Sequence, residues 1–201
     1  KHFFLGYSPE RINVGDNKND SILRKALAIG ADNAVRINQN TLNSRLVAAS
    51  IAQYCQDKNF DLIFCGRESI DYNGGKVPGF LAEKLGIPFI NSCIGLEFKD
   101  NLIECKREID NGNEICESSL PALIAGQKGL VEEKDLKIPS MRGIMTARTK
   151  PLNIIELNIT LEHSIKAKNY EKPVGRSDCK IMNEDEVDKL IDLLSQEAKV
   201  I

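Results

Sequence analysis

The sequence lacks most of the motifs by which enzymes are recognised. It contains no tryptophan, and its two histidines, His2 and His163, are far apart with no other metal ligands clustered near either. A metal site is therefore not expected, and no Ser/His/Asp catalytic set can be assembled. Walker A, G-x-S-x-G and H-E-x-x-H motifs are also missing. These absences favour a binding or carrier role over a self-contained enzyme.

The composition argues against several further classes. Lys and Arg number 27 and Asp and Glu number 29, so the balanced charge gives no sign of a nucleic-acid-binding surface. No apolar run approaches the length of a membrane span, and Phe3-Phe4-Leu5 is too short for the core of a signal peptide. The six cysteines are scattered without a C-x-x-C pair, and several fall in predicted strands. We expect buried thiols in a reducing compartment, and hence a cytoplasmic protein.

The most informative stretch is residues 61–85, which predicts a strand, a polar loop and a helix. Residues 62–65 form a short apolar run typical of a strand buried on both faces, and Gly66 ends it. The polar loop that follows contains Gly74-Gly75. From Val77 to residue 85 the apolar residues recur at helical spacing, and Gly86 stands where a helix C-cap belongs.

This loop has two interpretations. In an open α/β sheet, ligands bind at the carboxyl ends of the strands, and a glycine pair before a helix exposes backbone N–H groups to an anion. Lys76 adds a positive charge, so the loop would cradle a nucleotide phosphate, with Asp71 on a ribose hydroxyl. Alternatively, the glycines only make a βα turn and Asp71 only holds the loop. The glycines alone favour this second interpretation, because the loop matches neither Walker A nor G-x-G-x-x-G.

The first part of the chain alternates between strand and helix. Residues 12–15 predict a strand end, residues 20–30 a helix capped by Asn19 or Asp20, and residues 33–37 a strand. Thr41 is expected to cap a second helix. This order predicts an α/β fold with an open, mostly parallel sheet and helices on both faces. The loops at 15–20 and 66–76 then lie at one sheet edge, which favours a nucleotide crevice.

The pattern changes after Gly86. Strands are expected at residues 89–98, 102–109, 114–118 and 120–125, with turns at 99–101 and around Asn111-Gly112. We expect these strands to extend the sheet in antiparallel fashion. A last short strand is expected at residues 152–157.

Two later segments are candidates for contacts with partners. Ser140 is expected to cap a helix over residues 141–148 that combines Met and Ile with basic residues. It is either an amphipathic surface helix, which we favour, or a projecting docking element. Residues 162–177 predict a linker, followed by an amphipathic helix capped by Asn183. That helix folds back on its own domain or, as we favour, packs on a partner chain. We therefore expect a domain over residues 1–160 and an arm over residues 161–201.

Three stretches together resemble the β subunit of electron-transfer flavoprotein. They are LRKALAIGAD at residues 23–32, GRESID at residues 66–71, and REIDNGNE at residues 107–114 followed by PALIA at residues 121–125. Each is weak alone, but their order and spacing are specific, and the resemblance runs from about Ile12 to the C-terminus.

The resemblance implies an α/β fold of the adenine nucleotide α-hydrolase type and one half of an αβ heterodimer. The heterodimer would accept electrons from acyl-CoA or other flavin dehydrogenases on an FAD held mainly by the α subunit. It would pass them to a quinone oxidoreductase or another acceptor. The β subunit would bind AMP structurally, and the C-terminal arm would wrap the α subunit. By position, the AMP pocket would be lined by Val14, Gly15, Gly66, Asp71, Gly74, Gly75, Lys76 and Val77. The family's partner-docking loop would correspond to Ile138, Pro139 and Met141.

Several residues depart from the family pattern. Asn111 replaces the usual Gly or Asp, and Cys105 and Cys116 replace aliphatic residues. The loop at residues 72–77 differs from both the AMP-binding and the electron-bifurcating versions, and a non-bifurcating member is favoured. The family's first strand and the loop after it are not found ahead of Lys1, so we expect an incomplete nucleotide site. The alternative is an adenine-nucleotide-binding regulatory module without flavin. A nucleotide hydrolase is disfavoured because no Ser-Gly-Gly phosphate loop is present.

Overall fold

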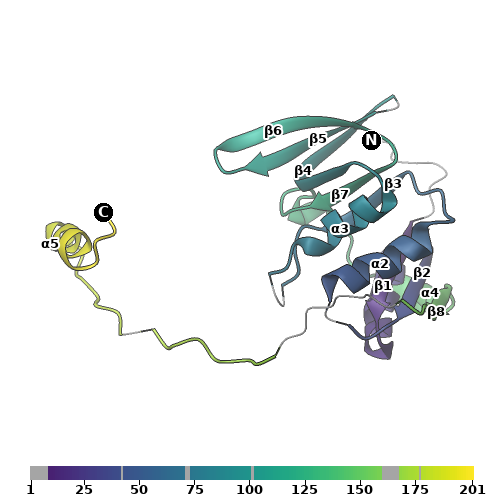
Figure 1. The fold of residues 1–201 in the computed structure, drawn as a ribbon, viewed down its shortest axis with the longest axis horizontal. Helices are drawn as coiled ribbons and strands as arrows, with labels where there is room; N and C mark the ends of the chain where they lie inside the picture. Colours follow the sequence, from purple (N-terminus) through teal and green to yellow (C-terminus); the bar gives the residue numbers. More distant parts are fainter. Residues whose placement is uncertain (1–8, 42, 71–72, 101, 160–167, 177) are drawn as a thin grey trace. The chain divides into compact units, whose positions relative to one another are not determined.

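The computed structural model describes residues 9–41, 43–70, 73–100, 102–159, 168–176 and 178–201. The chain divides into two units, Lys1–Ile165 and Lys166–Ile201 (Figure 1). The first unit contains β1 to β8 and α1 to α4, and the second contains α5. Each unit is described by itself.

The first sheet has three parallel strands in the order β1-β2-β8. β1 (Glu10–Gly15) pairs along its whole length with β2 (Asn33–Asn38), and β2 pairs on its other side with β8 (Leu152–Ile155). Between β1 and β2 the chain makes a 3-10 turn, η1 (Asn17–Asn19), and then α1 (Asp20–Ala28).

The second sheet has five strands in the order β3-β7-β4-β5-β6. β3 and β4 both run parallel to β7, whereas β5 is antiparallel to β4 and β6 is antiparallel to β5. The predicted antiparallel extension is therefore confirmed. The bounds are β3 Leu62–Gly66, β4 Phe89–Lys99, β5 Leu102–Ile109, β6 Gly112–Ser119 and β7 Ala122–Gly126.

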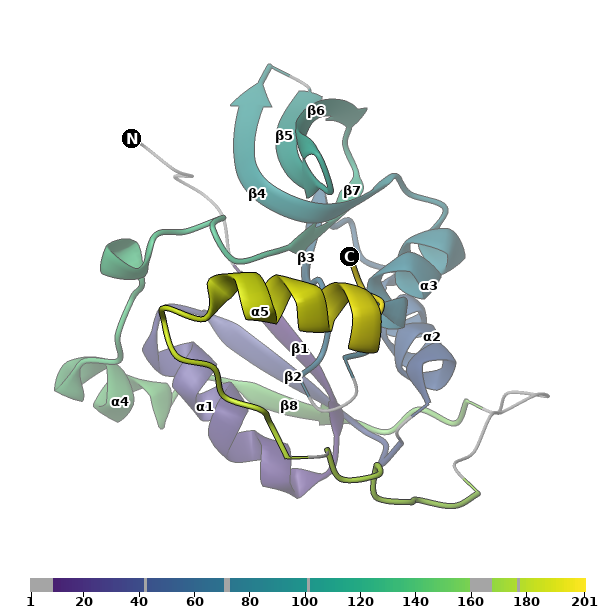
Figure 2. The same cartoon turned by 90° about the vertical axis from the view of Figure 1, so that its left-hand side faces the viewer.

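Helices pack against strands of both sheets. α1 packs on α4 (Met141–Ala147) and β2, with Leu23, Leu27 and Ala34 in a shared buried cluster. α2 (Ser44–Cys55) and α3 (Lys76–Leu85) lie side by side and bury Leu123 of β7 (Figure 2). A short 3-10 turn, η2 (Glu133–Asp135), precedes α4. Burying a single Leu or Ile side chain contributes about 1.5–3 kcal/mol, so these clusters hold the layers together.

The fold class is the predicted one, an α/β protein with mostly parallel strands, flanking helices and an antiparallel extension. The strands form two separate sheets, and β1 and β3 are edge strands of different sheets. No hydrogen bond joins β1 to β3 among the residues that the structure describes. A cavity of about 380 Å³ lies between them and is lined by the beginnings of both strands, including Ile12 and Leu62.

Two of the predicted helix caps were wrong. At α1 the candidate Asn19 is the N-cap residue, as predicted, although its side chain makes no capping bond, and the other candidate, Asp20, is the first residue of the helix. At α2, Asn43 is the cap instead of Thr41, because its side chain accepts the N–H groups of Arg45 and Leu46.

The second wrong cap is in the second unit, where α5 begins three residues later than expected. Its bounds are Val187–Asp192, and Asn183 instead donates its backbone N–H to the Glu186 carboxylate at 3.2 Å. A wider turn, η3 (Leu193–Glu197), continues α5. Neither segment contains a buried residue. Over the described part of the chain, no helix is long and apolar enough to cross a membrane.

Candidate functional site

The predicted nucleotide-binding residues lie at the ends of two strands and the start of one helix. Val14 and Gly15 end β1, Gly66 ends β3, and Gly74 and Gly75 directly precede α3. Lys76 and Val77 are the first residues of α3. Asp71 lies outside the described residues.

The turn after β1 is tightly built. A Cβ atom on Gly15 would lie 1.9 Å from Nδ2 of Asn19, so a side chain at this position would have to displace the Asn19 side chain. Asn19 Nδ2 donates to Asn13 Oδ1 at 2.9 Å, and Asp16 Oδ1 accepts the backbone N–H of Lys18 at 3.0 Å. The polar loop is therefore held by its own short side chains, as in other Asx-rich turns.

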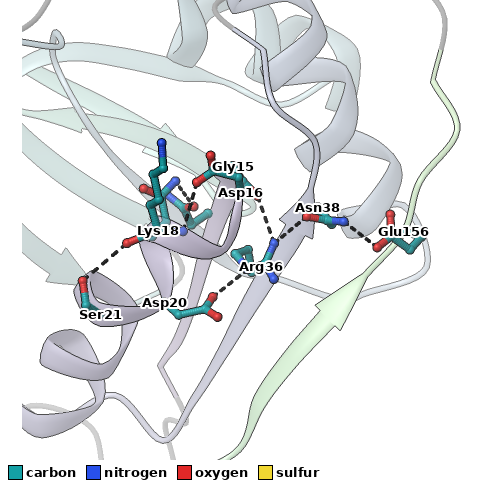
Figure 3. Close-up of polar contacts among 10 residues, drawn as sticks. Gly15, Asp16, Lys18, Asp20, Ser21, Arg36, Asn38 and Glu156 are labelled. Carbon is teal, nitrogen blue, oxygen red and sulfur yellow. Dashed lines mark hydrogen bonds and ion pairs between the residues drawn. The ribbon is translucent and has the colours of Figure 1, made fainter.

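A buried arginine holds the carboxyl ends of β1 and β2 together (Figure 3). Arg36 is only 4% exposed, and its Nε donates to Asp20 Oδ1 at 2.6 Å. Its Nη1 donates to the Gly15 carbonyl at 3.1 Å and to Asn38 Oδ1 at 2.6 Å. A buried charge is tolerated when it is paired and hydrogen-bonded, as here. Sequence reasoning missed this residue, although an arginine inside an apolar strand was a visible signal.

The same network reaches the third strand of the sheet. Asn38 Nδ2 donates to Glu156 Oε1 at 2.6 Å, just beyond the end of β8 (Figure 3). The carboxyl ends of all three parallel strands are thus joined by polar contacts at one sheet edge. This is the edge at which ligands bind in open α/β sheets.

The loop after β3 is tied to the second sheet by Arg67. Its backbone N–H donates to the Gly126 carbonyl at 3.1 Å, and its Nη1 donates to Gln127 Oε1 at 2.6 Å. Gln127 in turn donates to Glu108. The Arg67 guanidinium also contacts both carboxylate oxygens of Glu68 at 3.1 Å. These contacts hold the first residues of the loop against the ends of β5 and β7.

The second half of this loop leads into α3 through closely packed glycines. The Ser69 N–H donates to the Gly74 carbonyl at 3.1 Å. A Cβ on Gly75 would lie 3.2 Å from the Arg67 carbonyl oxygen, which leaves little room for a side chain. Gly75 is the N-cap residue of α3, and no side chain among the residues that the structure describes caps the helix there. The first N–H groups of an α-helix have no partner within the helix, which suits an anion.

The two loops stay separate in the described structure. No hydrogen bond or ion pair joins residues 13–20 to the described residues of 66–77. The loops follow strands of different sheets. Whether they form one nucleotide site remains a prediction. Within the described residues, no group of His, Cys, Asp and Glu is placed to hold a metal ion.

The predicted docking residues project from the surface around the start of α4. Ile138 is 85% exposed and Met141 is 77% exposed, and Pro139 is also exposed. Ser140 Oγ accepts the Gly143 N–H at 3.0 Å, so the predicted cap of this helix is confirmed. The short helix therefore starts at a defined residue and exposes Met141, Ile144 and Met145, whereas Ala147 is buried against α1.

Three of the described cysteines, Cys55, Cys65 and Cys105, are poor nucleophiles because their pKa values are raised. Burial raises the pKa of both Cys55 and Cys65 from 9.0 to about 11. Burial, with the neighbouring Cys93 as a smaller cause, raises the pKa of Cys105 to about 12. The thiolate is the nucleophilic form, so these thiols are inert at neutral pH.

Comparison with known proteins places the chain in a family. A family model described as "Electron transfer flavoprotein domain" matches residues 10–160. The chain is 35% identical to "Electron transfer flavoprotein subunit beta" of Bacillus subtilis (strain 168), over 94% of this chain and 78% of the relative. It is 31% identical to the protein of the same name from Syntrophomonas wolfei, over 93% of this chain and 74% of the relative. It is 29% identical to "Electron transfer flavoprotein subunit beta, mitochondrial" of Arabidopsis thaliana, over 94% of this chain and 76% of the relative.

These matches agree with the resemblance in the three sequence stretches and with the α/β architecture. The family model covers all the strands of the first unit and helices α1 to α4. The chain therefore belongs to the electron transfer flavoprotein family, in its β-subunit branch, and is an electron-carrier subunit and not an enzyme.

Proposed function

We propose that this chain pairs with an electron transfer flavoprotein α subunit, which holds most of a shared FAD. The family match over residues 10–160 carries the proposal. The FAD would supply the electron-accepting chemistry, and this chain would brace the flavin-bearing subunit and present the docking surface. Donors would be acyl-CoA or other flavin dehydrogenases, and the acceptor a quinone oxidoreductase or similar protein. The free thiols are consistent with a cytoplasmic, reducing environment.

The β subunit would bind AMP at the loops after β1 and β3. The closely packed Gly75 and the N-terminus of α3, which no side chain of the described residues caps, support a phosphate at that helix end. Lys76 would add a positive charge, and Gly15 would let the backbone approach the nucleotide. Gly66, Gly74, Val14 and Val77 would line the same pocket, with Asp71 on the ribose.

The exposed residues before and in α4 would dock a partner dehydrogenase. Ile138 would be the apolar anchor, with Pro139 and Met141 beside it. An exposed apolar side chain of this kind contributes to binding when it enters a pocket on the partner. We expect Ile138→Ala to slow electron acceptance from a dehydrogenase about tenfold, or by about 1.4 kcal/mol. The flavin spectrum should not change, and Ile22→Ala, at an exposed position of α1, is the matched control.

The decisive experiment is co-expression of this chain with the α subunit encoded beside it. The visible spectrum of the purified complex and the nucleotides released by acid are then measured. A yellow heterodimer with FAD and AMP in equal amounts is expected. A colourless chain that carries an adenine nucleotide would instead favour a regulatory module without flavin, and the carrier proposal would fail.

A further inference from the structure

Residues of α1 and of the segment around α4 line an apolar groove at the surface, beside the proposed docking residues. Its volume is about 550 Å³. Ala28, Pro139, Ile144 and Ala147 supply its apolar walls, and no acidic residue lines it. Such a groove has the size and lining of a site that receives one or two apolar side chains.

The groove is preformed, because two cations clamp α4 to α1. Arg24 Nη1 donates to the carbonyls of Ala147 and Lys150, at 2.7 Å each. Lys150 Nζ donates in the other direction, to the Leu27 carbonyl at 3.2 Å and the Ala31 carbonyl at 2.5 Å. Each cation thus satisfies carbonyl groups at the end of the opposing helix.

A close backbone contact fixes the same arrangement. A Cβ on Gly143 would lie only 2.5 Å from the Ala28 carbonyl oxygen. α4 therefore lies directly against α1 at this point. A partner side chain would find the groove open without rearrangement, which lowers the entropic cost of binding.

The rim of the groove is positively charged. Lys25 and Arg148 both line it, and both are exposed. Neither forms an ion pair with any residue that the structure describes. The chain as a whole carries a net charge of −2, so this local excess of positive charge is not a property of the whole surface. Unpaired cations around an apolar groove select a ligand with apolar and acidic groups.

Apolar side chains continue outward from the groove. Met145 is 66% exposed in the same helix as Ile144, and Ile138 and Met141 flank Pro139. Several exposed apolar side chains within one short segment are typical of a protein interaction site, and methionine adapts to different partners. The surface therefore combines an exposed apolar anchor, Ile138, with a groove that can bind an apolar side chain of a partner.

We propose that the α1–α4 groove binds an apolar side chain on an acidic helical segment of a protein partner. Leu or a similar residue would enter the groove, and carboxylates one helical turn away would pair with Lys25 and Arg148. The inference deepens the docking role given under the proposed function and rests on it for the identity of the partner. The groove would also select partners by charge, because Lys25 and Arg148 would repel a segment with lysines around its leucine.

Three synthetic helical peptides test the proposal with the 201-residue chain. The first carries Leu flanked by Glu, the second has each Glu changed to Lys, and the third has each Leu changed to Ala. Binding is measured by fluorescence anisotropy, and the binding site by backbone amide shifts in NMR. We expect the first peptide to bind about tenfold or more tightly than the others, with shifts confined to α1 and residues 138–150.

The charge requirement is tested with Lys25→Glu/Arg148→Glu, which should weaken binding of the first peptide about tenfold. The control, Lys84→Glu/Lys106→Glu, makes the same change in net charge at exposed positions outside the groove. Circular dichroism of each variant verifies folding, and the peptide series on the unmodified chain does not depend on any variant.

Several results would overturn the proposal. Equal binding of the Glu and Lys peptides, or shifts outside α1 and residues 138–150, would refute selection at this groove. Displacement of the peptide by phosphatidylglycerol vesicles but not by phosphatidylcholine vesicles would indicate a membrane surface instead of a protein partner. The peptide experiment requires neither flavin nor the α subunit, so its result can be interpreted even if the carrier proposal fails. Likewise, failure of the peptides to bind would not contradict the carrier proposal.

Discussion

At the scale of single residues, the glycines differ sharply in what they do. Gly143 lies against the Ala28 carbonyl, where a Cβ would stand at 2.5 Å, whereas a Cβ on Gly79 in α3 would meet Phe89 at an ordinary 3.7 Å. Both glycines are helical, so propensity alone would favour alanine at either position. Packing decides the outcome, because a backbone oxygen cannot move aside as the end of a side chain can.

Gly143→Ala should lower the free energy of unfolding by about 1–3 kcal/mol, the usual cost of overpacking. Gly79→Ala should raise it by about 0.5–1 kcal/mol, since alanine is the better helix former and loses less entropy on folding. Urea unfolding of both variants measures the difference. Equal effects of the two substitutions would mean that the contact between α1 and α4 is not as close as described.

The buried Cys55 thiol and the half-buried Cys65 thiol make stability depend on pH in the alkaline range. The pKa of Cys55 and of Cys65 is raised by burial from 9.0 to about 11, so the folded state keeps these protons after the unfolded state has lost them. The unfolded state then binds fewer protons, and stability falls as the pH rises from about 9 to about 11.

Each thiol should lower the free energy of unfolding by roughly 1–2 kcal/mol over that range. Cys55→Ala/Cys65→Ala should therefore show a shallower decrease between pH 8.5 and 11 than the unmodified chain, whatever its stability at pH 7. Cys179→Ala, which replaces an exposed thiol, is the control. Parallel curves for the double variant and the unmodified chain would contradict the burial of these thiols.

At the scale of elements, the start of α3 combines two opposing requirements. Among the residues that the structure describes, no side chain caps this helix, and Lys76 stands in its first turn, where the helix dipole disfavours a cation. A positive residue at the positive end of a helix costs stability unless it serves another purpose. Binding of a nucleotide phosphate is such a purpose and supports the proposed AMP site.

Lys76→Glu should change the stability of the chain and its retention of AMP in opposite directions. We expect the free energy of unfolding to rise by about 0.3–1 kcal/mol, because an acidic residue suits the helix N-terminus. AMP retention, measured by acid release from the purified heterodimer, should fall. Lys84→Glu in the last turn of the same helix is the control and should leave AMP occupancy unchanged. Unchanged occupancy in Lys76→Glu would remove this helix end from the nucleotide site.

At the scale of the whole molecule, the described residues of the second unit form no core of their own. α5 buries no residue, and its apolar stripe, which includes Val187, Leu190 and Ile191, is exposed. A short amphipathic helix is only marginally stable alone and gains stability from a surface that covers its apolar side. The α subunit is the proposed surface.

Leu190→Asp/Ile191→Asp should abolish or strongly weaken assembly with the α subunit. The melting temperature of the isolated chain should not change, because these side chains contribute nothing to a core. Pull-down of the co-expressed α subunit and thermal unfolding measure the two effects. The control, Asp188→Asn/Asp192→Asn, alters polar positions of the same helix. Normal assembly of the aspartate variant would refute the role of the arm in wrapping the partner.

The sequence by itself determined the elements whose signals are local. The apolar run of β3, the helical spacing of α3 and the glycine after it needed only neighbouring residues, and Gly86 indeed adopts the left-handed conformation with φ +65°. The family motifs likewise lie in short stretches. Thr41 and Asn43 show the limit, because both are good caps and only the local backbone geometry decided between them.

Only the tertiary structure decided features that join distant residues. Arg36 contacts residues 16 and 21 positions away, and Arg24 reaches carbonyls 123 and 126 positions away, so no local pattern predicted the buried ion pair or the groove. The split into two sheets likewise depends on which strands pair. Periodicity shows which side of a strand is buried, but packing of the whole chain decides which strands pair with one another. The loops after β1 and β3 were therefore predictable from the sequence, whereas their position relative to each other was not.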